Sequence, residues 1–525
     1  MDHPTSSERC RGVVCKRRLV RSEVADSSEC NPAQKPPARK SRASAQQEVK
    51  AQLCWQGHVH FHTYHKDGVL ICDDFLAGHC HLGQECQRHH TPRPYHWQLR
   101  QTHTKDWVNV SEFGQKHLEA LFCNPDKTEV TLSFENAGGQ GDLVQRQHRN
   151  VYHKSQTKGE MVCEDTGSVS GFSKLDLNTL IPQNNCSYNK VRRLATTSNP
   201  DLNPHFLTKW NISWQELGKW ELYKEPVISQ LEAAFEKGMW NQAFMLNGNL
   251  YNVDLKKYTQ RNLTTNFIRE VRRRPQLISD TELWPLIKTL PLEESKDRLV
   301  VSGPDPLKPS KKGLPPTWVP RVPRKEVFAQ IPVLKSGVAY ACIHNLFHRS
   351  LSKSEAIILD IYQIQNMHLW TKYTIQKKFM SRGLPSAELS QLEMLLFHGT
   401  TKEAVPSICK NNFDPRVSGR QHGSTYGQGT YFAKNASCSA RYAIESKSGS
   451  RYMFLAMVLV GKAAVGKQSF RRPPPLEPDS PTSDLYNSCV DKEQQPQMFV
   501  IFDSCQCYPY FLIHYKKLTD TVDVF

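Results

Sequence analysis

The sequence predicts a multidomain α+β protein, and three observations lead to this fold class. Its 525 residues are enough for two to four domains of roughly 100–200 residues each. Cysteine and histidine cluster in residues 66–95, which indicates a small unit stabilised by a metal. The last two hundred residues begin with a segment of helical apolar period and continue with apolar runs of strand length. A helix followed by strands favours an α+β domain over repeated β-α-β units.

Charge and hydropathy narrow the class of protein further. The 68 Lys and Arg residues exceed the 51 Asp and Glu residues, and the resulting net charge of +17 favours a polyanionic partner. No apolar stretch reaches the ~18 residues of a membrane-spanning helix, and the first twenty residues lack the apolar core of a secretory signal. We therefore expect a soluble chain with no membrane partner. Its 16 cysteines are expected to be reduced thiols or metal ligands.

Residues 1–65 are expected to form a disordered basic tail, because they are rich in Ser, Pro, Gln and basic residues and lack an apolar period. Two basic clusters, at residues 16–18 and 35–42, suit a nuclear-import signal or a phosphate-binding arm. The alternative is a merely solvated tail. On the first interpretation we expect the protein in the nucleus, with the cytoplasm as a second location.

A zinc finger is predicted over residues 66–95. Three thiols and one imidazole follow the spacing C-x7-C-x5-C-x3-H, supplied by Cys72, Cys80, Cys86 and His90. Such a set binds Zn²⁺ tetrahedrally, and metal ligation would supply the folding free energy of a segment this short. His89 competes with His90 for the fourth position. Residues 96–199 are polar without a sustained pattern and are expected to be a connector and linker.

The spacing resembles the CCCH zinc-finger family, many members of which bind single-stranded RNA through backbone contacts and aromatic stacking. The resemblance implies RNA as a partner, and Phe75 is a candidate stacking platform. Residues 87–89 hold no second aromatic ring of the kind that many RNA-binding fingers have there, and there is one finger only. A structural or protein-docking finger is the alternative.

Residues 200–280 are predicted to be a small α+β unit. A helix would begin at Pro226, bury Ile228 and Leu231, and end at Gly238, before short strands at 243–246 and 250–253. The unit resembles a WWE domain, a fold that recognises ADP-ribose in several proteins. The residues that could face the adenine ring and the diphosphate are Tyr223, Tyr251, Arg272 and Arg273. The alternative is that the aromatic residues are core and that the basic run is a solvated face. A Pro-rich linker follows at 281–319.

Within residues 320–525, five apolar residues recur at three- and four-residue spacing and predict one face of a helix. They are Ile357, Ile361, Ile364, Met367 and Trp370. The uninterrupted apolar run 452–460, bounded by Gly461, predicts a strand covered on both faces. Residues 497–502 and 510–515 are expected to be a further pair of antiparallel strands.

The sharpest functional signal is a set of motifs in this last region. Phe397-His398-Gly399-Thr400 is followed by Gly427-Gln428-Gly429-Thr430-Tyr431-Phe432-Ala433 and then by Ser437-x-Ser439-x-x-Tyr442. In this order, within an α+β domain, they resemble the catalytic domain of the poly(ADP-ribose) polymerase family. The resemblance implies NAD as substrate.

Carried over to this sequence, the family's roles fall on six residues. His398 would hydrogen-bond a ribose hydroxyl, and Gly399 would hold the nicotinamide carboxamide with its backbone. Thr400 would contact the adenosine ribose, and Ser439 would bond the carboxamide. Tyr431 and Tyr442 would enclose the nicotinamide ring, a flat slot that suits a flat cation.

Met498 occupies the position at which the polymerising members of the family have a glutamate. A thioether is at best a weak acceptor and cannot activate a ribose hydroxyl for chain elongation. With His398 and Tyr431 as its catalytic neighbours, the sequence predicts a protein mono-ADP-ribosyltransferase. Its acceptors would be protein side chains, including its own. The alternative is a catalytically silent adaptor that binds RNA and ADP-ribose.

Overall fold

The computed structural model describes residues 68–134, 171–283 and 327–525, with short gaps at 78–79, 184–186, 204 and 418–423, and a few residues between 307 and 318. The expected basic tail, with its two basic clusters, and most of the expected Pro-rich linker lie outside the described residues. Within the described part of the chain, every helix is too short or too polar to cross a membrane.

The zinc-finger segment has little regular structure. It contains the one-turn helix α2 (Asp73–Leu76) and the 3-10 turn η1 (Gly83–Glu85). The buried side chain of Leu76 packs with Ile71 and Leu194 in a small apolar cluster. Because this cluster is small, apolar burial alone supplies the segment with little stability.

The expected connector at 96–199 contains a folded unit, which corrects that expectation. Its elements are β1 (Tyr95–Gln101), β2 (Trp107–Asn109), α3 (Glu112–Cys123), β3 (Glu129–Ser133), β4 (Phe172–Asp176), β5 (Pro182–Gln183) and β6 (Tyr188–Ala195). Many of its buried residues are polar, which is why the segment looked like a linker. Arg193 and Glu119, for example, form a buried ion pair of 2.7 Å that ties β6 to α3.

The unit at 210–275 repeats this order of elements. It consists of β7 (Trp210–Glu216), β8 (Lys219–Leu222), α4 (Glu225–Glu236), β9 (Asn241–Leu246), β10 (Asn249–Asp254), β11 (Thr259–Asn262) and β12 (Ile268–Pro275). The sheet order is β8-β7-β12-β11-β10-β9, and β2-β1-β6 and β5-β4-β3 follow the same succession in the first unit. The predicted helix and the two predicted strands are confirmed. Gly238, in the left-handed region at φ 68°, follows the end of α4.

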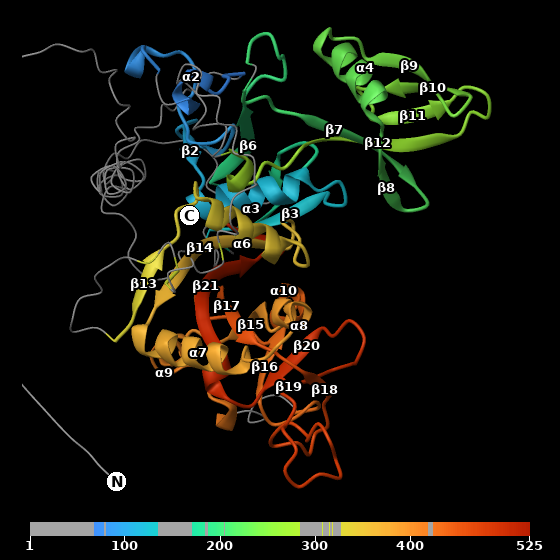
Figure 1. The fold of residues 1–525 in the computed structure, drawn as a ribbon. Coiled ribbons are helices and arrows are strands. Elements are labelled where there is room, and N and C mark those ends of the chain that lie inside the picture. Colours follow the sequence, from blue (N-terminus) through green and yellow to red (C-terminus); the bar gives the residue numbers. More distant parts are fainter. Residues whose placement is uncertain are drawn as a thin grey trace, which may run out of the picture. The chain divides into compact units, whose positions relative to one another are not determined.

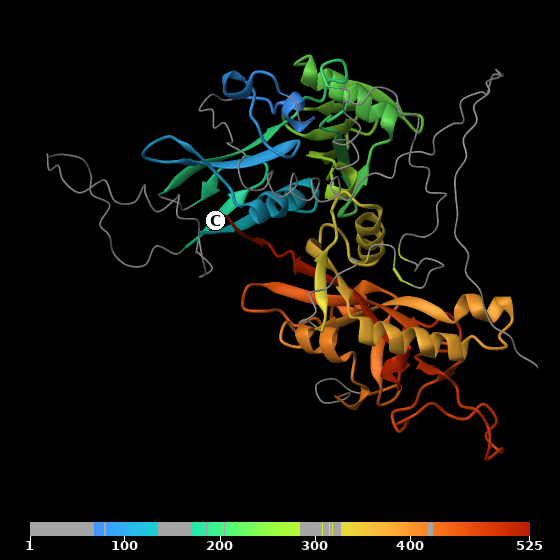
Figure 2. The ribbon, with the colours of Figure 1, turned by 60° about the vertical axis from the view of Figure 1, so that its left-hand side comes forward.

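The catalytic region is built on one nine-stranded sheet, shown in two views in Figures 1 and 2. Its strands, in sheet order, are β13 (Ala329–Pro332), β14 (Ala356–Gln365), β21 (Cys507–Lys517), β17 (Ser450–Leu459), β15 (Glu393–Thr400), β16 (Thr430–Ala433), β20 (Met498–Ile501), β19 (Ser488–Val490) and β18 (Ala463–Val465). Its longer helices are α6 (Val338–His348), α7 (Met367–Met380), α8 (Ser386–Gln391) and α9 (Val405–Asn411), with a short α10 (Ala436–Ser439).

Strand β17 confirms the prediction of a strand covered on both faces. Met453 and Leu455 pack into one apolar cluster with residues of α6 and α7, whereas Phe454 and Ala456 pack into a second cluster with residues of α9. Successive side chains of a strand point to opposite faces, so the sheet lies between these two layers.

The helix predicted from Ile357, Ile361, Ile364, Met367 and Trp370 was wrong over its first part. Residues 356–365 form strand β14, and helix α7 begins only at Met367. The register of β14 against β21 shifts between Ile358 and Asp360. Ile361 and Ile364 of the predicted helix face pack into different apolar clusters, so their three-residue spacing does not mark one buried face.

The two strands predicted at 497–502 and 510–515 exist, as β20 and β21, but they do not pair with each other. β20 pairs with β16 and β19, whereas β21 lies between β14 and β17. The short connection between the two strands suggested a hairpin. Strands that follow each other in the sequence need not pair in the sheet, however.

The C-terminal residues of the catalytic region complete a sheet of the first unit. Strand β22 (Thr521–Asp523) pairs in parallel with β3, and Val522 is fully buried there. Figure 2 shows the red C-terminal segment running from the sheet of the last region to the blue-green part of the chain. A hydrogen bond of 2.8 Å between His117 Nε2 and the Thr519 carbonyl adds to this contact.

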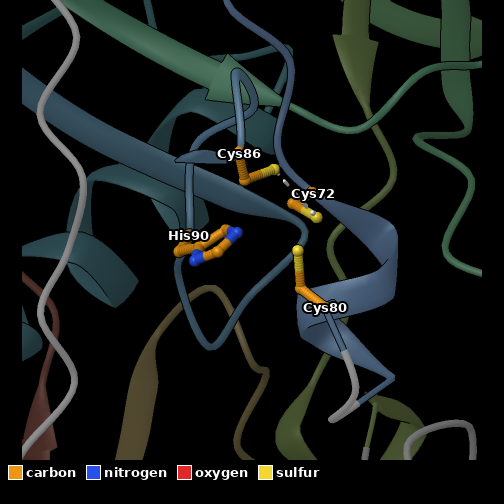
Figure 3. Close-up of side chains that lie close together, drawn as sticks. All are labelled: Cys72, Cys80, Cys86 and His90. Carbon is orange, nitrogen blue, oxygen red and sulfur yellow. Dashed lines mark hydrogen bonds between the residues drawn. The ribbon is translucent and has the colours of Figure 1, made fainter. Parts of the chain in front are cut away.

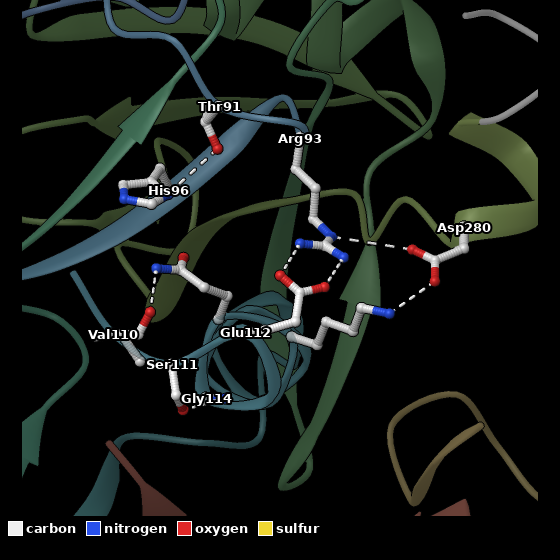
Figure 4. A network of polar contacts seen from close by, with 10 residues as sticks. Thr91, Arg93, His96, Val110, Ser111, Glu112, Gly114 and Asp280 are labelled. Carbon is white, nitrogen blue, oxygen red and sulfur yellow. Dashed lines mark hydrogen bonds and ion pairs between the residues drawn. The ribbon is translucent and has the colours of Figure 1, made fainter. Parts of the chain in front are cut away.

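A network of charged residues anchors α3 at its start (Figure 4). Arg93 donates to both carboxylate oxygens of Glu112, and Lys116 donates to Asp280 at 2.7 Å. Asp280 also lies 3.9 Å from Arg93. The charges of Lys116 and Arg93 hold the pKa of the buried Asp280 carboxyl well below its usual value. The residues that follow the second unit are thereby tied to the first.

The burial of Val522 generates a prediction. Val522→Asp would place an unpaired carboxylate among apolar side chains and should cost about 3 kcal/mol or more at this contact. Hydrogen exchange followed by mass spectrometry should show faster exchange of the β3 amides at residues 129–133. Thr521→Asp is the matched control, because Thr521 is only partly buried. Unchanged protection of β3 in Val522→Asp would contradict the assignment of β22.

Candidate active site and zinc centre

The candidate active site lies where strands β15 and β16 separate. The two strands share one backbone pair, Phe397 with Ala433. The next residue, His398, bridges them with its side chain, because Nδ1 lies 2.8 Å from the Tyr431 carbonyl oxygen. A carbonyl oxygen can only accept, so Nδ1 carries the proton and Nε2 is left as an acceptor while the ring is neutral. Burial lowers the pKa of His398 and thus favours this neutral form.

Gly399 is fixed by the approach of α10 to β15. A Cβ at position 399 would lie 2.0 Å from the Ser439 carbonyl oxygen and 2.9 Å from the Ala443 nitrogen, distances that no side chain tolerates. The Ser439 hydroxyl donates to the Phe397 carbonyl at 2.9 Å and is buried. The glycine therefore allows α10 to sit against the end of the strand.

Tyr431 and Tyr442, the two tyrosines of the predicted motifs, differ in their contacts and in their exposure. The Tyr431 hydroxyl donates to the Gly427 carbonyl at 2.9 Å and accepts from the Tyr426 amide at 3.0 Å, which fixes the glycine-rich loop to β16. Tyr442 follows α10 and is 36% exposed. Burial raises the pKa of Tyr431, and Tyr442 adds to this effect, so the two hydroxyls lie within electrostatic reach of each other.

Met498 begins strand β20, where it pairs with Ala433 on β16. The Asp491 carboxylate accepts hydrogen bonds from the backbone amides of Gln497 and Met498 at 2.9 and 3.1 Å. Asp491 thus caps the start of β20 through one oxygen, Oδ1.

The structure brings five of the sequence-predicted residues together: His398 and Gly399 at the end of β15, Tyr431 on the neighbouring strand, and Ser439 and Tyr442 on and after α10. Thr400 ends β15 and is buried. Sequence reasoning missed Gly427 as the hydrogen-bond partner of Tyr431 and Asp491 as the cap of β20. Gly427 belongs to the predicted motif, but its hydrogen bond to Tyr431 was not predicted, and Asp491 lies outside every motif.

The candidate zinc centre is a tight group of four donor atoms. One ligand atom each of Cys72, Cys80, Cys86 and His90 lies within 4.8 Å of every other (Figure 3). Three thiols and one imidazole at this spacing fit the tetrahedral coordination of Zn²⁺. Burial raises the pKa of the Cys72 thiol to about 12, so this thiol needs a cation beside it to give up its proton.

The structure decides between the two histidines of the finger. His90 joins the cysteines, whereas His89 stacks on His96 with ring centroids 4.7 Å apart. Phe75 stacks on His90 at 4.3 Å with an interplanar angle of 14°. One face of Phe75, the candidate platform for RNA, therefore supports a zinc ligand.

In the second unit, Tyr223 and Tyr251 both lie against Phe244, at centroid distances of 5.5 and 6.1 Å. The hydroxyl of the buried Tyr223 donates to Gln260. Arg269 lies over the ring of Trp214, which is itself 6.5 Å from the Tyr223 ring. Trp214, Gln260 and Arg269 are the residues of this cluster that sequence reasoning missed.

The structure does not bring Arg272 or Arg273 to the two tyrosines. Arg273 forms a two-fold ion pair with Glu232 at 2.7 and 2.8 Å and covers the ring of Trp210. Arg272 lies 4.2 Å over Trp220 and donates to the Pro125 carbonyl. Side chains alternate along β12, so adjacent arginines start from opposite faces of the strand. In the basic run, Arg269 is the residue beside the aromatic cluster.

The zinc centre yields a prediction about metal content. The purified chain should hold one zinc ion, measured by atomic emission, and Cys86→Ser should lose it, because three protein ligands hold Zn²⁺ more weakly than four. Cys505→Ser, at a partly buried thiol outside the cluster, should keep the metal. Full zinc content in Cys86→Ser would contradict the ligand set.

Two family descriptions match the sequence. The poly(ADP-ribose) polymerase catalytic domain matches residues 339–517, and the WWE domain matches residues 209–273. The first match contains the candidate active site, and the second contains the cluster around Tyr223.

The chain is also similar to curated proteins. The Mus musculus "Protein mono-ADP-ribosyltransferase PARP12" is 32% identical over 472 residues, which cover 86% of this chain and 58% of the relative. The Homo sapiens "Protein mono-ADP-ribosyltransferase PARP11" is 30% identical over 338 residues, which cover 59% of this chain and 90% of the relative. The chain thus spans a little over half the length of the first relative and most of the second. With both domains matched and these relatives aligned, the chain belongs to the poly(ADP-ribose) polymerase family.

Proposed function

We propose that the protein transfers single ADP-ribose units from NAD to protein side chains, with release of nicotinamide. The observation that carries the proposal is the convergence of His398, Gly399, Tyr431 and Ser439 at the point where β15 and β16 separate. The names of the relatives support the same reaction. The WWE and catalytic domains imply ADP-ribose and NAD as ligands.

The contacts of His398 suit a positioning role in this reaction. Nδ1 is held by the Tyr431 carbonyl, so the neutral ring can accept a ribose hydroxyl proton at Nε2 and hold the sugar in one orientation. Nicotinamide is cationic in NAD and leaves as a neutral molecule, so the departure needs no general acid. The chain's task is to orient the ring, keep water out and stabilise the positive charge that develops on the ribose.

The side chain of Met498 supports transfer without elongation. Elongation needs a base or strong acceptor for the hydroxyl of an attached ribose, and a thioether supplies neither. Asp491, the neighbouring carboxylate, already accepts two backbone amides. A single unit per acceptor site is the expected product.

The remaining parts of the chain receive supporting roles in the proposal. The zinc ion, held by the Cys3His set, stabilises the finger, and the cluster of Tyr223, Tyr251 and Arg269 binds ADP-ribose. RNA as a partner of the finger and the nucleus as location are proposals that rest on the finger spacing and on the basic clusters of the tail. The acceptors include the chain itself.

The first test is incubation of the purified chain with labelled NAD. His398→Ala should abolish labelling, and Gly399→Ala should reduce it by roughly 10²-fold, because the added Cβ displaces α10 from β15. His368→Ala, at an exposed position on α7, should label like wild type. All variants should retain zinc. If wild type labels no protein at saturating NAD, the silent adaptor replaces the enzyme as the function.

The second test concerns product length. Met498→Glu should still attach single units, because a carboxylate at 498 does not by itself build the site for an acceptor ribose. Met498→Gln, of similar size and without charge, is the matched control. Products resolved on denaturing gels should be of unit length in all three proteins, and long chains from Met498→Glu would refute this expectation.

A further inference from the structure

A cavity of about 470 Å³ lies between the first unit and the outer face of β12. Phe122, Leu177, Asn178 and Leu180 of the first unit line it on one side, and Lys257, Tyr258, Arg272, Arg273 and Arg274 of the second unit line it on the other. Its volume falls in the range of small-molecule sites. Tyr223 and Tyr251 are absent from its lining, so it is separate from the aromatic cluster described above.

Arg274 is the buried cation of this cavity and forms no ion pair among the described residues. It is 5% exposed, and its guanidinium donates to neutral oxygens only, with distances of 3.1 Å to the Leu177 carbonyl and 2.8 Å to Asn178 Oδ1. Its buried Nε has no hydrogen-bond partner. A buried charge without a counter-ion costs several kcal/mol, and burial accordingly lowers the pKa of Arg274 to about 10.

The positive charges of the other side chains that line the cavity are also only weakly balanced by carboxylates. Arg272 donates to the Pro125 carbonyl and lies 4.0 Å from Glu270, whose side chain is 66% exposed. Lys257 lies 3.9 Å from Asp254 and is 79% exposed. By contrast, the ion pair with Glu232 neutralises Arg273. Three cations therefore face the cavity against one lining carboxylate, Glu270.

We propose that this cavity binds the diphosphate group of a small nucleotide. Guanidinium groups recognise phosphate oxygens by charge-assisted hydrogen bonds, and Arg272 and Arg274 both line the cavity. The partly exposed ring of Tyr258 offers an aromatic surface for the base. A compact group fits better than a nucleic-acid backbone, because Arg274 is buried rather than arranged along an open surface stripe.

The test is titration of the full-length zinc-loaded chain with inorganic pyrophosphate, followed by calorimetry. We expect saturable binding of one equivalent, weakened about tenfold by Arg272→Gln, because each variant of this kind removes a charge-assisted hydrogen bond. Lys257→Gln should weaken binding in the same direction and provides a second variant at an exposed position if Arg272→Gln folds poorly. Unfolding temperature and zinc content identify variants that fold as wild type.

Two control variants test whether pyrophosphate binds in this cavity. Lys237→Gln removes one positive charge from an exposed position outside the cavity and should leave pyrophosphate binding unchanged. Tyr251→Ala should also leave it unchanged, because Tyr251 belongs to the aromatic cluster. Absence of saturable pyrophosphate binding, equal weakening by Lys237→Gln, or loss in Tyr251→Ala would each overturn the proposal, as would binding to single-stranded RNA but not to pyrophosphate.

A competition experiment with ADP tests whether the cavity recognises a nucleotide or the diphosphate alone. ADP that competes with pyrophosphate and binds more tightly supports a nucleotide whose base contacts Tyr258. Competition at equal affinity supports recognition of the diphosphate alone. ADP that does not compete overturns the nucleotide assignment.

Discussion

Burial of the central strands on both faces is the constraint on which the catalytic geometry depends. β17 and β15 are paired along their whole common length, and the apolar layers of α6, α7 and α9 cover their two faces. Close packing leaves such strands little freedom to shift. His398 and Gly399 are among the last residues of β15, so the packing of the strand also holds their backbone in place. The site itself lies where the ladder ends, and a side-chain hydrogen bond replaces the missing backbone pair.

Much of the candidate site could be predicted because its residues lie in contiguous motifs. His398, Gly399 and Tyr431 carry their chemistry in a few adjacent letters, and the structure brings them together. The contacts that fix them could not be predicted. Gly427 lies in a recognised motif, but the motif does not show that its carbonyl accepts from the Tyr431 hydroxyl, and Asp491 lies outside every motif. In the WWE domain the basic run was recognised, but its alternation along a strand was not applied. That alternation sends Arg269 to the aromatic cluster and Arg272 and Arg274 to the opposite face.

The errors in the fold have physical causes of the same kind. Strand β14 buries apolar residues in both apolar clusters, so its isoleucines matched a helical spacing without sharing one face, and periodicity alone pointed the wrong way. The first unit was missed because it buries hydrogen-bonded and ion-paired side chains, such as Gln115 and the Arg193–Glu119 pair, in place of a long apolar stripe. The amino-acid composition shows how polar a segment is. A polar side chain can nevertheless be buried where it finds a hydrogen-bond or ion-pair partner. The positive charge likewise divides between arginines paired with carboxylates, such as Arg193 and Arg273, and Arg274, whose guanidinium donates to neutral oxygens.

The parallel pairing of β22 with β3 has a consequence for biosynthesis. Ser111 and Asp523 hydrogen-bond across a separation of 412 residues, so the first unit cannot complete its sheet when it leaves the ribosome. At about 5–20 residues per second, the missing strand emerges tens of seconds later. During that interval the edge of β3 is unpaired, and an unpaired edge invites association with other strands. A chaperone that covers the edge of β3 would therefore act between the synthesis of β3 and the synthesis of β22.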